Sequence, residues 1–255
     1  MHILITGAAQ GIGAAIAAEV AKRGHTLTLV DVKGDVLTAT AEKLRQQGAM
    51  VTVLIGDLTS ADFISQLDAH LAQSPDKLDV LINNAAVAHP LRPFQDIPEE
   101  DLDQGLAVNV KAPFKLAQIG IKYMLPQGGG TIINVASRSN IYGYIHMAVY
   151  AATKAAITSF TGTIALENKT TGIRAFTIIP GRTNTQMQAQ LRGQAEASAA
   201  QPPEYVGEIV SKLIDNEIPG IESGDSLLVS FGEYRVMKEL DKGDLHKKMT
   251  SEQQN

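Results

Sequence analysis

Apolar residues along this chain fall into short β-type runs that alternate with longer segments of helical period. The runs are rich in Val, Ile, Leu and Thr, and the segments between them repeat their apolar positions every three to four residues. Strands that alternate with helices are typical of a parallel sheet with helices on both faces. We therefore expect a doubly wound α/β fold in a single domain, residues 1–232. Its seven predicted strands are residues 2–6, 26–31, 51–56, 78–83, 131–136, 173–179 and 226–230.

Cap residues and breaks in the alternation mark the remaining segments. One helix is predicted to begin with Thr59 as N-cap and Asp62 three residues later, and Pro98 followed by three acids suits a first helical turn. Residues 186–203, rich in Ala, Gln and Ser, interrupt the pattern and predict a short helix with a loop. Residues 233–255 are polar and charged, so we expect a C-terminal extension whose first half forms a helix.

Three glycines, Gly7, Gly11 and Gly13, lie between the first strand and the first helix. Glycines at such a turn permit close approach of the backbone to a pyrophosphate, and the free N–H groups at the helix start attract phosphate. The next strand ends at Asp31, eighteen residues beyond Gly13, where a carboxylate can accept both ribose hydroxyls of an adenosine. An Asp at the end of a strand is also a common turn residue. Together, the glycine turn and Asp31 predict a dinucleotide site.

Tyr150 and Lys154 are one helical turn apart, and Ser137 lies thirteen residues upstream of Tyr150. The β-carbons of Tyr150 and Lys154 are therefore about 5 to 6 Å apart on one helix face. A phenol has a pKa of about 10, and lowering it to about 7 requires roughly 4 kcal/mol, which a close cation can supply. We expect Lys154 to lower this pKa and Ser137 to hold a substrate oxygen while Tyr150 exchanges its proton. Ser139 is an alternative hydroxyl, and an ordinary helix with a half-buried Tyr is the structural alternative.

In their order along the chain, these motifs resemble those of the short-chain dehydrogenase/reductase family, from Thr6 to about Gly232. Residues 6–13 are similar to the family's cofactor turn, and residues 83–86 are similar to its Asn-Asn-Ala-Gly element. The resemblance implies a Rossmann-like fold with strand order 3-2-1-4-5-6-7, the cofactor across the carboxyl edge of the sheet, and a substrate lid over residues 186–203. The catalytic tetrad that it implies is Asn109, Ser137, Tyr150 and Lys154. The cofactor-binding residues that it implies are Gly7, Gln10, Gly11, Ile12, Gly13, Asp31, Asp57, Leu58, Asn84, Tyr150, Lys154, Thr183 and Thr185.

Three departures from the family pattern are visible in the sequence. Ala86 stands where the family usually has glycine, and Arg182 follows Pro180-Gly181 where bulky apolar residues are common. The chain also lacks the Asp-Gly-Gly that usually follows the last strand. The second and third departures leave the substrate and the assembly open.

The function implied by the resemblance is hydride transfer between a nicotinamide cofactor and a small alcohol or ketone, with Tyr150 as general acid/base. NAD is expected as the cofactor because Asp31 opposes the additional phosphate of NADP and Gln10 supplies no cation, although Lys33 is a nearby base. By resemblance, Asn109 holds a water molecule that links Lys154 to solvent; a helix kink or cap is its alternative role. The alternatives for the whole protein are an epimerase or lyase on the same fold and a non-catalytic dinucleotide-binding regulatory protein.

Three further features bear on the substrate and on assembly. Arg138 and Arg182 could bind an anionic substrate with paired hydrogen bonds, or could face solvent or pair with neighbouring acids. His146, four residues before Tyr150, could line the pocket or face solvent. Small residues between 151 and 162 could pack on a second subunit or on the chain's own sheet, and the resemblance favours a homodimer or homotetramer.

Composition excludes several other classes of protein. The 255 residues carry a net charge of −5 without a long basic cluster, which argues against a nucleic-acid partner. Cysteine is absent and the six histidines have no paired helical spacing, so we expect neither disulfides nor a metal site. The first strand begins at residue 2 and no apolar run is long enough to span a membrane, so we expect no targeting segment, no membrane partner and a cytoplasmic location.

Overall fold

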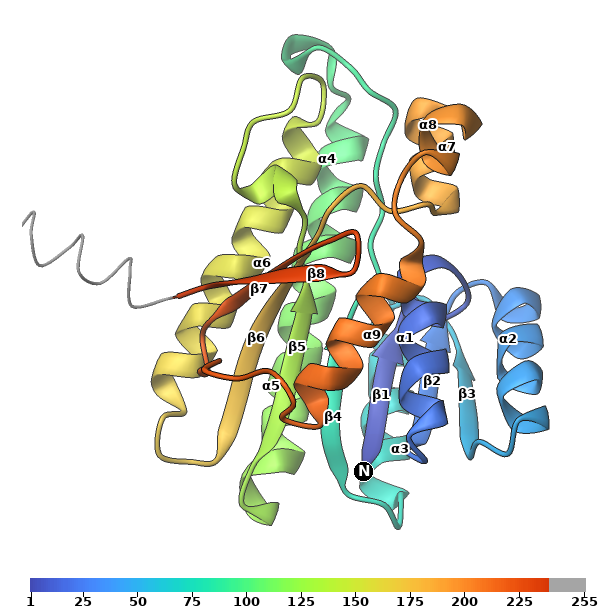
Figure 1. The fold of residues 1–255 in the computed structure, drawn as a ribbon, viewed down its shortest axis with the longest axis vertical. Helices are drawn as coiled ribbons and strands as arrows, with labels where there is room; N and C mark the ends of the chain where they lie inside the picture. The colour runs from blue at the N-terminus through green and yellow to red at the C-terminus, as the bar shows by residue number, and fades with distance from the viewer. Residues whose placement is uncertain (239–255) are drawn as a thin grey trace, which may run out of the picture.

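The computed structural model describes residues 1–238 as one sheet flanked by helices (Figure 1). Eight strands follow the order β3-β2-β1-β4-β5-β6-β7-β8, and every neighbouring pair is parallel except β7 and β8. The predicted order of the first seven strands is therefore confirmed. The strands are β1 (His2–Thr6), β2 (Thr26–Asp31), β3 (Val51–Ile55), β4 (Leu78–Asn83), β5 (Gly130–Val135), β6 (Ile173–Pro180), β7 (Ser226–Ser230) and β8 (Glu233–Met237).

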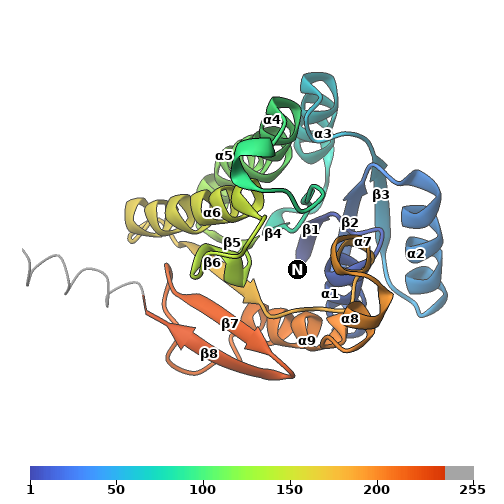
Figure 2. The same cartoon turned by 90° about the horizontal axis from the view of Figure 1, so that it is seen from above.

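Helices cover both faces of the sheet, as Figure 2 shows from above. Helices α1 (Gly11–Lys22), α2 (Gly34–Gln46) and α9 (Pro203–Ile214) share one apolar core with β1 and β2. Helices α3 (Ala61–Gln73), α5 (Ala112–Met124) and α6 (Ala148–Glu167) share a second core on the opposite face. The remaining elements are α4 (Glu99–Leu106), α7 (Gln186–Arg192), α8 (Gln194–Ser198), the 3₁₀ turns η1 (Phe94–Asp96), η3 (Leu125–Gln127) and η4 (Arg138–Asn140), and the π-helical turn η2 (Ala107–Lys111).

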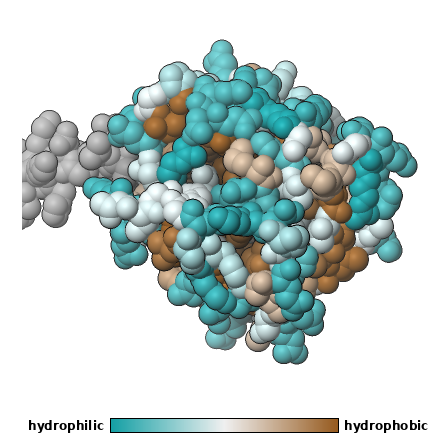
Figure 3. All heavy atoms as spheres, turned by 90° about the horizontal axis from the view of Figure 1, so that it is seen from below, coloured by the Kyte–Doolittle hydropathy of each residue, from teal (hydrophilic) through white to brown (hydrophobic). Residues whose placement is uncertain are grey.

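The carboxyl ends of the parallel strands meet at one end of the molecule, together with α7 and α8 (Figures 1 and 2). The opposite end, where the strands begin, is largely hydrophilic, and its apolar residues form separate patches (Figure 3). Among the described residues, no helix combines the length and the apolarity that crossing a bilayer requires. The predicted motifs lie at the other end, where the parallel strands have their carboxyl ends.

The prediction of a helix after residue 232 is wrong for the part that the structure describes. Residues 233–237 form β8, which pairs antiparallel with β7 and extends the sheet. Phe231 and Gly232 make the two-residue turn between these strands, with φ of 50° and 80°. Two successive positive φ angles match the right-handed twist of a tight hairpin, which helical propensity does not reveal. The rest of the predicted extension, residues 239–255, lies outside the described residues.

The start of α3 also differs from the prediction by one residue. Ser60, not Thr59, is the N-cap, and its Oγ accepts a hydrogen bond from the Phe63 N–H at 3.3 Å. The backbone N–H of Thr59 instead donates to Asp57 Oδ1 at 2.8 Å. The Asp57 side chain thus turns the chain just before the helix, which moves the cap to the next hydroxyl.

Replacement of Ser60 by Ala should destabilise the protein because the Phe63 N–H would lose its partner. The expected loss is about 1 kcal/mol in the free energy of unfolding, measured by urea denaturation. Thr59→Ala is the matched control and should cost less than about half as much. An equal loss in both variants would contradict the assignment of the cap to Ser60.

Candidate active site

The glycine turn between β1 and α1 is packed too tightly for a side chain at Gly7 or Gly13. A Cβ built on Gly13 would lie 2.1 Å from the carbonyl oxygen of Gly7, and one built on Gly7 would lie 2.7 Å from the Cα of Ala85. Gly7 and Gly11 also have φ of 65° and 59°, in the left-handed region that favours glycine. This turn therefore joins the ends of β1 and β4 to the start of α1.

The start of α1 has the properties of a phosphate site. Gln10 is its N-cap but makes no side-chain cap hydrogen bond, and the first turn contains no acidic residue. Ile12 is partly buried against the core below the turn. The backbone N–H groups at this helix end lie at the positive end of the helix dipole, with no side-chain cap from Gln10 and no acid beside them. The donor set fits the pyrophosphate of a dinucleotide.

Asp31 and Asn84 hold the glycine turn from its two sides. Asp31 Oδ2 accepts from the Ala9 N–H and Oδ1 accepts from the Lys33 N–H, both at 3.0 Å. Asn84 Nδ2 donates to the carbonyl oxygens of Thr6 and Gly7, both at 3.0 Å. Both side chains therefore have a structural task beside the turn. The role of Asp31 as acceptor of the ribose hydroxyls stays a prediction.

Asp57 and Leu58 follow β3 on the same edge of the sheet. The Asp57 side chain is engaged with Thr59 and is exposed, whereas Leu58 packs partly buried against the second core. The two residues are thus close to the expected adenine end of the site. The structure shows no contact that would give either of them a further role.

Tyr150, Ser137 and Lys154 come together at the carboxyl ends of β5 and β6. Tyr150 and Ser137 are hydrogen-bonded to each other through their side chains. Lys154 is 2% exposed, its Nζ donates to the carbonyl oxygen of Val135 at 2.8 Å, and the same atom lies 5.6 Å from the centroid of the Tyr150 ring. The rival hydroxyl of Ser139 is buried and has no hydrogen-bond partner among the described residues. The structure thus brings Ser137, and not Ser139, to Tyr150.

Burial controls the protonation of both ionisable groups. It raises the pKa of Tyr150 to about 12, and the hydrogen bond to Ser137 opposes this rise only in part. It also lowers the pKa of Lys154 to about 8. The prediction that Lys154 brings the Tyr150 pKa towards 7 is therefore wrong for this arrangement. The physical reason is that loss of water around the phenolate outweighs an ammonium group that is itself desolvated and directed at the Val135 carbonyl.

Asn109 lies in the π-helical turn η2 and is fully buried. Its Oδ1 accepts from the Val87 N–H at 2.8 Å, and its Nδ2 donates to the Val87 carbonyl at 2.9 Å and to Thr153 Oγ1 at 3.1 Å. Both N–H groups of the side-chain amide are used by these contacts. Asn109 thus fixes the loop after β4 to α6, one residue before Lys154.

Thr183 and Thr185 follow β6 and lead into α7. Thr183 is 5% exposed, and its Oγ1 donates to the Gly181 carbonyl at 3.0 Å. Thr185 is the N-cap of α7, where its Oγ1 accepts from the Gln188 N–H at 3.2 Å. A Cβ built on Gly11 would lie 3.2 Å from Thr185 Cγ2. The segment after β6 therefore reaches across to the glycine turn.

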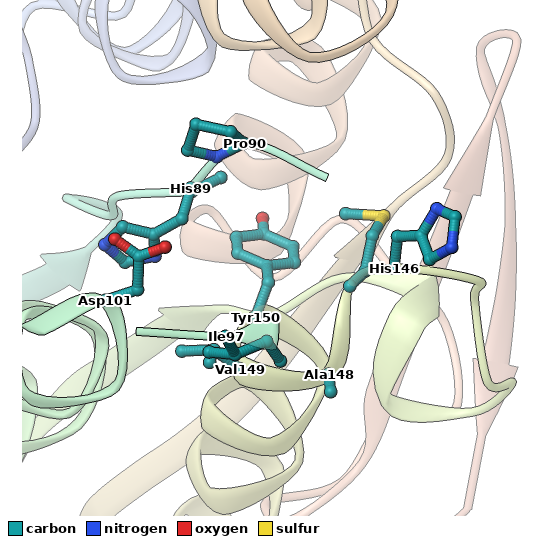
Figure 4. Close-up of a pocket in the computed structure, with 10 residues that line it drawn as sticks. His89, Pro90, Ile97, Asp101, His146, Ala148, Val149 and Tyr150 are labelled. Atoms are coloured by element: carbon teal, nitrogen blue, oxygen red, sulfur yellow. The ribbon is translucent and has the colours of Figure 1, made fainter. Parts of the chain in front are cut away.

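A small pocket opens in front of the Tyr150 hydroxyl, as Figure 4 shows. Its volume is about 20 Å³, which is enough for about one water molecule. Ala88, His89 and Pro90 form part of its wall, and His146, for which the sequence left a pocket or a solvent position open, lies at its other side. Ile97 and Asp101 also line the pocket but were not expected, because only the folding of α4 against α6 brings them there.

The two arginines expected near the substrate have different surroundings. Arg182 is 73% exposed at its side chain and lies 3.7 Å from Glu196, which is the alternative role given for it above. The Arg138 side chain has its Nε buried without a hydrogen-bond partner in residues 1–238. A third arginine, Arg192 of α7, contacts the pocket residue Met147 at 3.6 Å. The lid therefore touches the pocket through Arg192, a residue that the sequence did not single out.

Comparisons with known proteins agree with this geometry. A family model described as short chain dehydrogenase matches residues 1–196. The NAD-dependent glycerol dehydrogenase of Listeria innocua is 34% identical over 211 residues, 83% of this chain and 78% of that protein. The structure of 7α-hydroxysteroid dehydrogenase with NADH and 7-oxo glycochenodeoxycholic acid matches with a TM-score of 0.81 and 27% identity, over 91% of this chain and 93% of that one. Actinorhodin polyketide ketoreductase with NADPH matches with a TM-score of 0.83 and 28% identity, over 91% and 97%.

The family model covers well over half of the chain, and the glycerol dehydrogenase passes 30% identity across most of it. The two solved structures share the fold over 91% of this chain. The chain is a member of the short-chain dehydrogenase/reductase family, and therefore an NAD(P)-dependent oxidoreductase that acts on CH–OH and C=O groups.

Proposed function

We propose that this protein interconverts a small alcohol and its ketone, with NAD preferred over NADP and Tyr150 as the general acid/base. The observation that carries the proposal is the Tyr150 hydroxyl, which points into the small pocket (Figure 4). It is hydrogen-bonded to Ser137, and the buried Lys154 lies one helical turn further along α6. The size of the pocket supports a small reacting group. The relatives act on substrates as different as glycerol and a steroid, so their names do not decide the substrate.

A bound nicotinamide would supply the hydride, and the chain's own residues would handle the oxygen and its proton. The raised pKa of Tyr150 keeps its proton at neutral pH, which suits donation to a carbonyl oxygen during reduction. Ser137 would hydrogen-bond the same oxygen and hold it near Tyr150. Lys154 would bond the nicotinamide ribose, and its charge there would help Tyr150 to lose a proton in the reverse direction. The same geometry would serve an epimerase or lyase that also uses Tyr150.

The preference for NAD rests on Asp31. Its carboxylate is anchored by two backbone N–H groups and would oppose the charge of a phosphate on the adenosine ribose. Lys33 is the nearest base, but its Nζ is directed at Gln186 Oε1 of α7, 3.4 Å away. The exposed small side chains of Ala152, Ala155 and Ser159 on α6 support the expectation of a homodimer or homotetramer.

Tyr150→Phe should lower turnover of any substrate by about 100-fold to 10,000-fold while NADH binding and the circular dichroism spectrum stay unchanged. The measurement is the absorbance of the nicotinamide during reduction of a panel of small ketones and oxidation of small alcohols. Ser137→Ala should also lower turnover, and Ser139→Ala is the matched control that should retain it. Near-normal turnover in Tyr150→Phe would refute the assignment, and substrate conversion without net absorbance change would favour the epimerase or lyase.

Asp31→Asn should reduce the preference for NAD because it removes the negative charge and keeps an acceptor oxygen. We expect the ratio of kcat/KM for NAD to kcat/KM for NADP to fall by at least about tenfold, which corresponds to about 1.4 kcal/mol. Asp35→Asn, which removes an acid from the first turn of α2, is the control and should leave the ratio within about twofold. A wild-type protein that prefers NADP would contradict the proposal.

Lys154→Met should change how stability depends on pH. The pKa of Lys154 is lowered from 10.5 to about 8 in the fold, so the unfolded chain binds more protons between these pH values. Wild-type stability should therefore rise from about pH 8 to pH 10 by up to about 3 kcal/mol, a rise that the variant lacks. Urea denaturation at pH 7 to 10 measures it. Tyr150→Phe retains Lys154 and should keep the rise; parallel profiles for wild type and Lys154→Met would mean that Lys154 is hydrated.

A further inference from the structure

Gln201 is fully buried at the base of the lid, between the end of α8 and the start of α9. Its backbone forms an isolated parallel bridge with Thr183, in which the Asn184 N–H donates to the Gln201 carbonyl at 2.8 Å and the Gln201 N–H donates to the Arg182 carbonyl at 3.1 Å. The start of the lid segment, residues 186–203, is thereby held beside its end. The bridge between Thr183 and Gln201 thus joins the segments that lead into and out of α7 and α8.

The side chain of Gln201 extends this connection to the last hairpin of the sheet. Its Nε2 donates to Thr183 Oγ1 at 3.2 Å and to the Val229 carbonyl at 3.3 Å, and its Oε1 accepts from the Phe231 N–H at 2.6 Å. Both amide hydrogens and the amide oxygen are therefore used. Thr183 and Val229 are buried and the bond to the Phe231 N–H is part-buried, so loss of the amide would remove a hydrogen-bond partner from each of these groups.

The segment from Gly181 to Thr183 is packed directly against this amide. The Gly181 N–H donates to the Val229 carbonyl at 2.7 Å, so that carbonyl accepts from both Gly181 and Gln201. A Cβ built on Gly181 would lie 3.3 Å from the Val229 oxygen and 3.4 Å from Gln201 Nε2. The backbone that follows Pro180 can therefore lie in its observed position only while the Gln201 amide and the β7 strand end keep theirs.

We infer that Gln201 is a positioning residue that sets the backbone at Thr183 for the nicotinamide end of the cofactor, and that links this backbone to the β7–β8 hairpin. The inference rests on the proposed function and on the family resemblance, which implies that the segment with Thr183 and Thr185 contacts the nicotinamide. Gln201 does not itself reach the glycine turn or Asp31. Its loss should therefore affect the nicotinamide half of the cofactor and leave the adenosine half bound.

The test compares NADH with ADP-ribose, which lacks the nicotinamide, by calorimetric titration of the full chain. In Gln201→Met we expect the Kd for NADH to rise at least about fivefold and kcat to fall at least about tenfold, with the Kd for ADP-ribose within about twofold of wild type. Gln127→Met is the matched control, because Gln127 Nε2 also donates to two backbone carbonyls, those of Leu78 and Gly129, at the opposite end of the sheet. It should change none of the three values.

A second variant distinguishes loss of the amide donors from simple loss of the fold. Gln201→Glu keeps an acceptor for the Phe231 N–H but loses the donors to Thr183 and Val229, and protonation of the carboxyl restores one of these two donors. Its NADH affinity and kcat, each relative to wild type, should therefore recover as the pH is lowered, which a merely structural defect would not do. Amide hydrogen exchange at Asn184 and Phe231 should be faster in Gln201→Met than in wild type and unchanged in Gln127→Met.

The possible failures are distinguishable. If the wild-type protein bound neither NADH nor NADPH, the proposed function itself would be refuted. Wild-type protein that binds NADH, together with a Gln201→Met variant that keeps its NADH affinity and kcat, would overturn the inference about Gln201 alone. Equal loss of NADH and ADP-ribose affinity in that variant would also overturn it, because the effect would then be a general loosening of the site.

Discussion

The close approach of α1 to the ends of β1 and β4 is the constraint on which the site depends. Gly13 leaves no room for a Cβ beside the Gly7 carbonyl, and the Asn84 side chain fills the remaining space by bonding the carbonyls of Thr6 and Gly7. With this contact made, the first turn of α1 is fixed at the carboxyl edge of the sheet, where its unpaired N–H groups face the position of a phosphate. Asp31 is then held by Ala9 at the correct side of the turn.

In the half of the site that contains Tyr150 and Lys154, burial shifts the protonation of both side chains. Both side chains are shielded from water, which raises the pKa of Tyr150 and lowers the pKa of Lys154, so that the neutral form of each is favoured. The Val135 carbonyl holds the ammonium group close to the tyrosine ring but not at its hydroxyl. The local electrostatics therefore favour a protonated tyrosine, and a group that binds above it would decide when the proton leaves. Perturbed ionisable groups of this kind are a common mark of an active site.

The C-terminal hairpin lies where the chain lacks the Asp-Gly-Gly of its family's pattern, one of its three departures, and the structure connects that departure to the site. The turn at Phe231-Gly232 begins β8, and the Phe231 N–H is bound by the Gln201 amide at the base of the lid. The hairpin, the lid and the strand end after Pro180 thus share one buried hydrogen-bond network. In such a network each partner constrains the position of the others, so a change in the hairpin can alter the backbone position at Thr183.

Periodicity and residue spacing were enough to predict seven strands, the glycine turn and the grouping of Ser137, Tyr150 and Lys154, because these follow from local propensity and from the rule that parallel strands end at one edge. The order of the strands came from the resemblance to the family. Tertiary structure alone decided the rest. The strand β8 has exposed, mixed side chains without a clear pattern, so it exists only because β7 offers an open edge. The pKa of Tyr150, the pocket residues Ile97 and Asp101, and the contacts of Gln201 all depend on which buried groups meet across distant segments, and spacing along the chain carries no record of that.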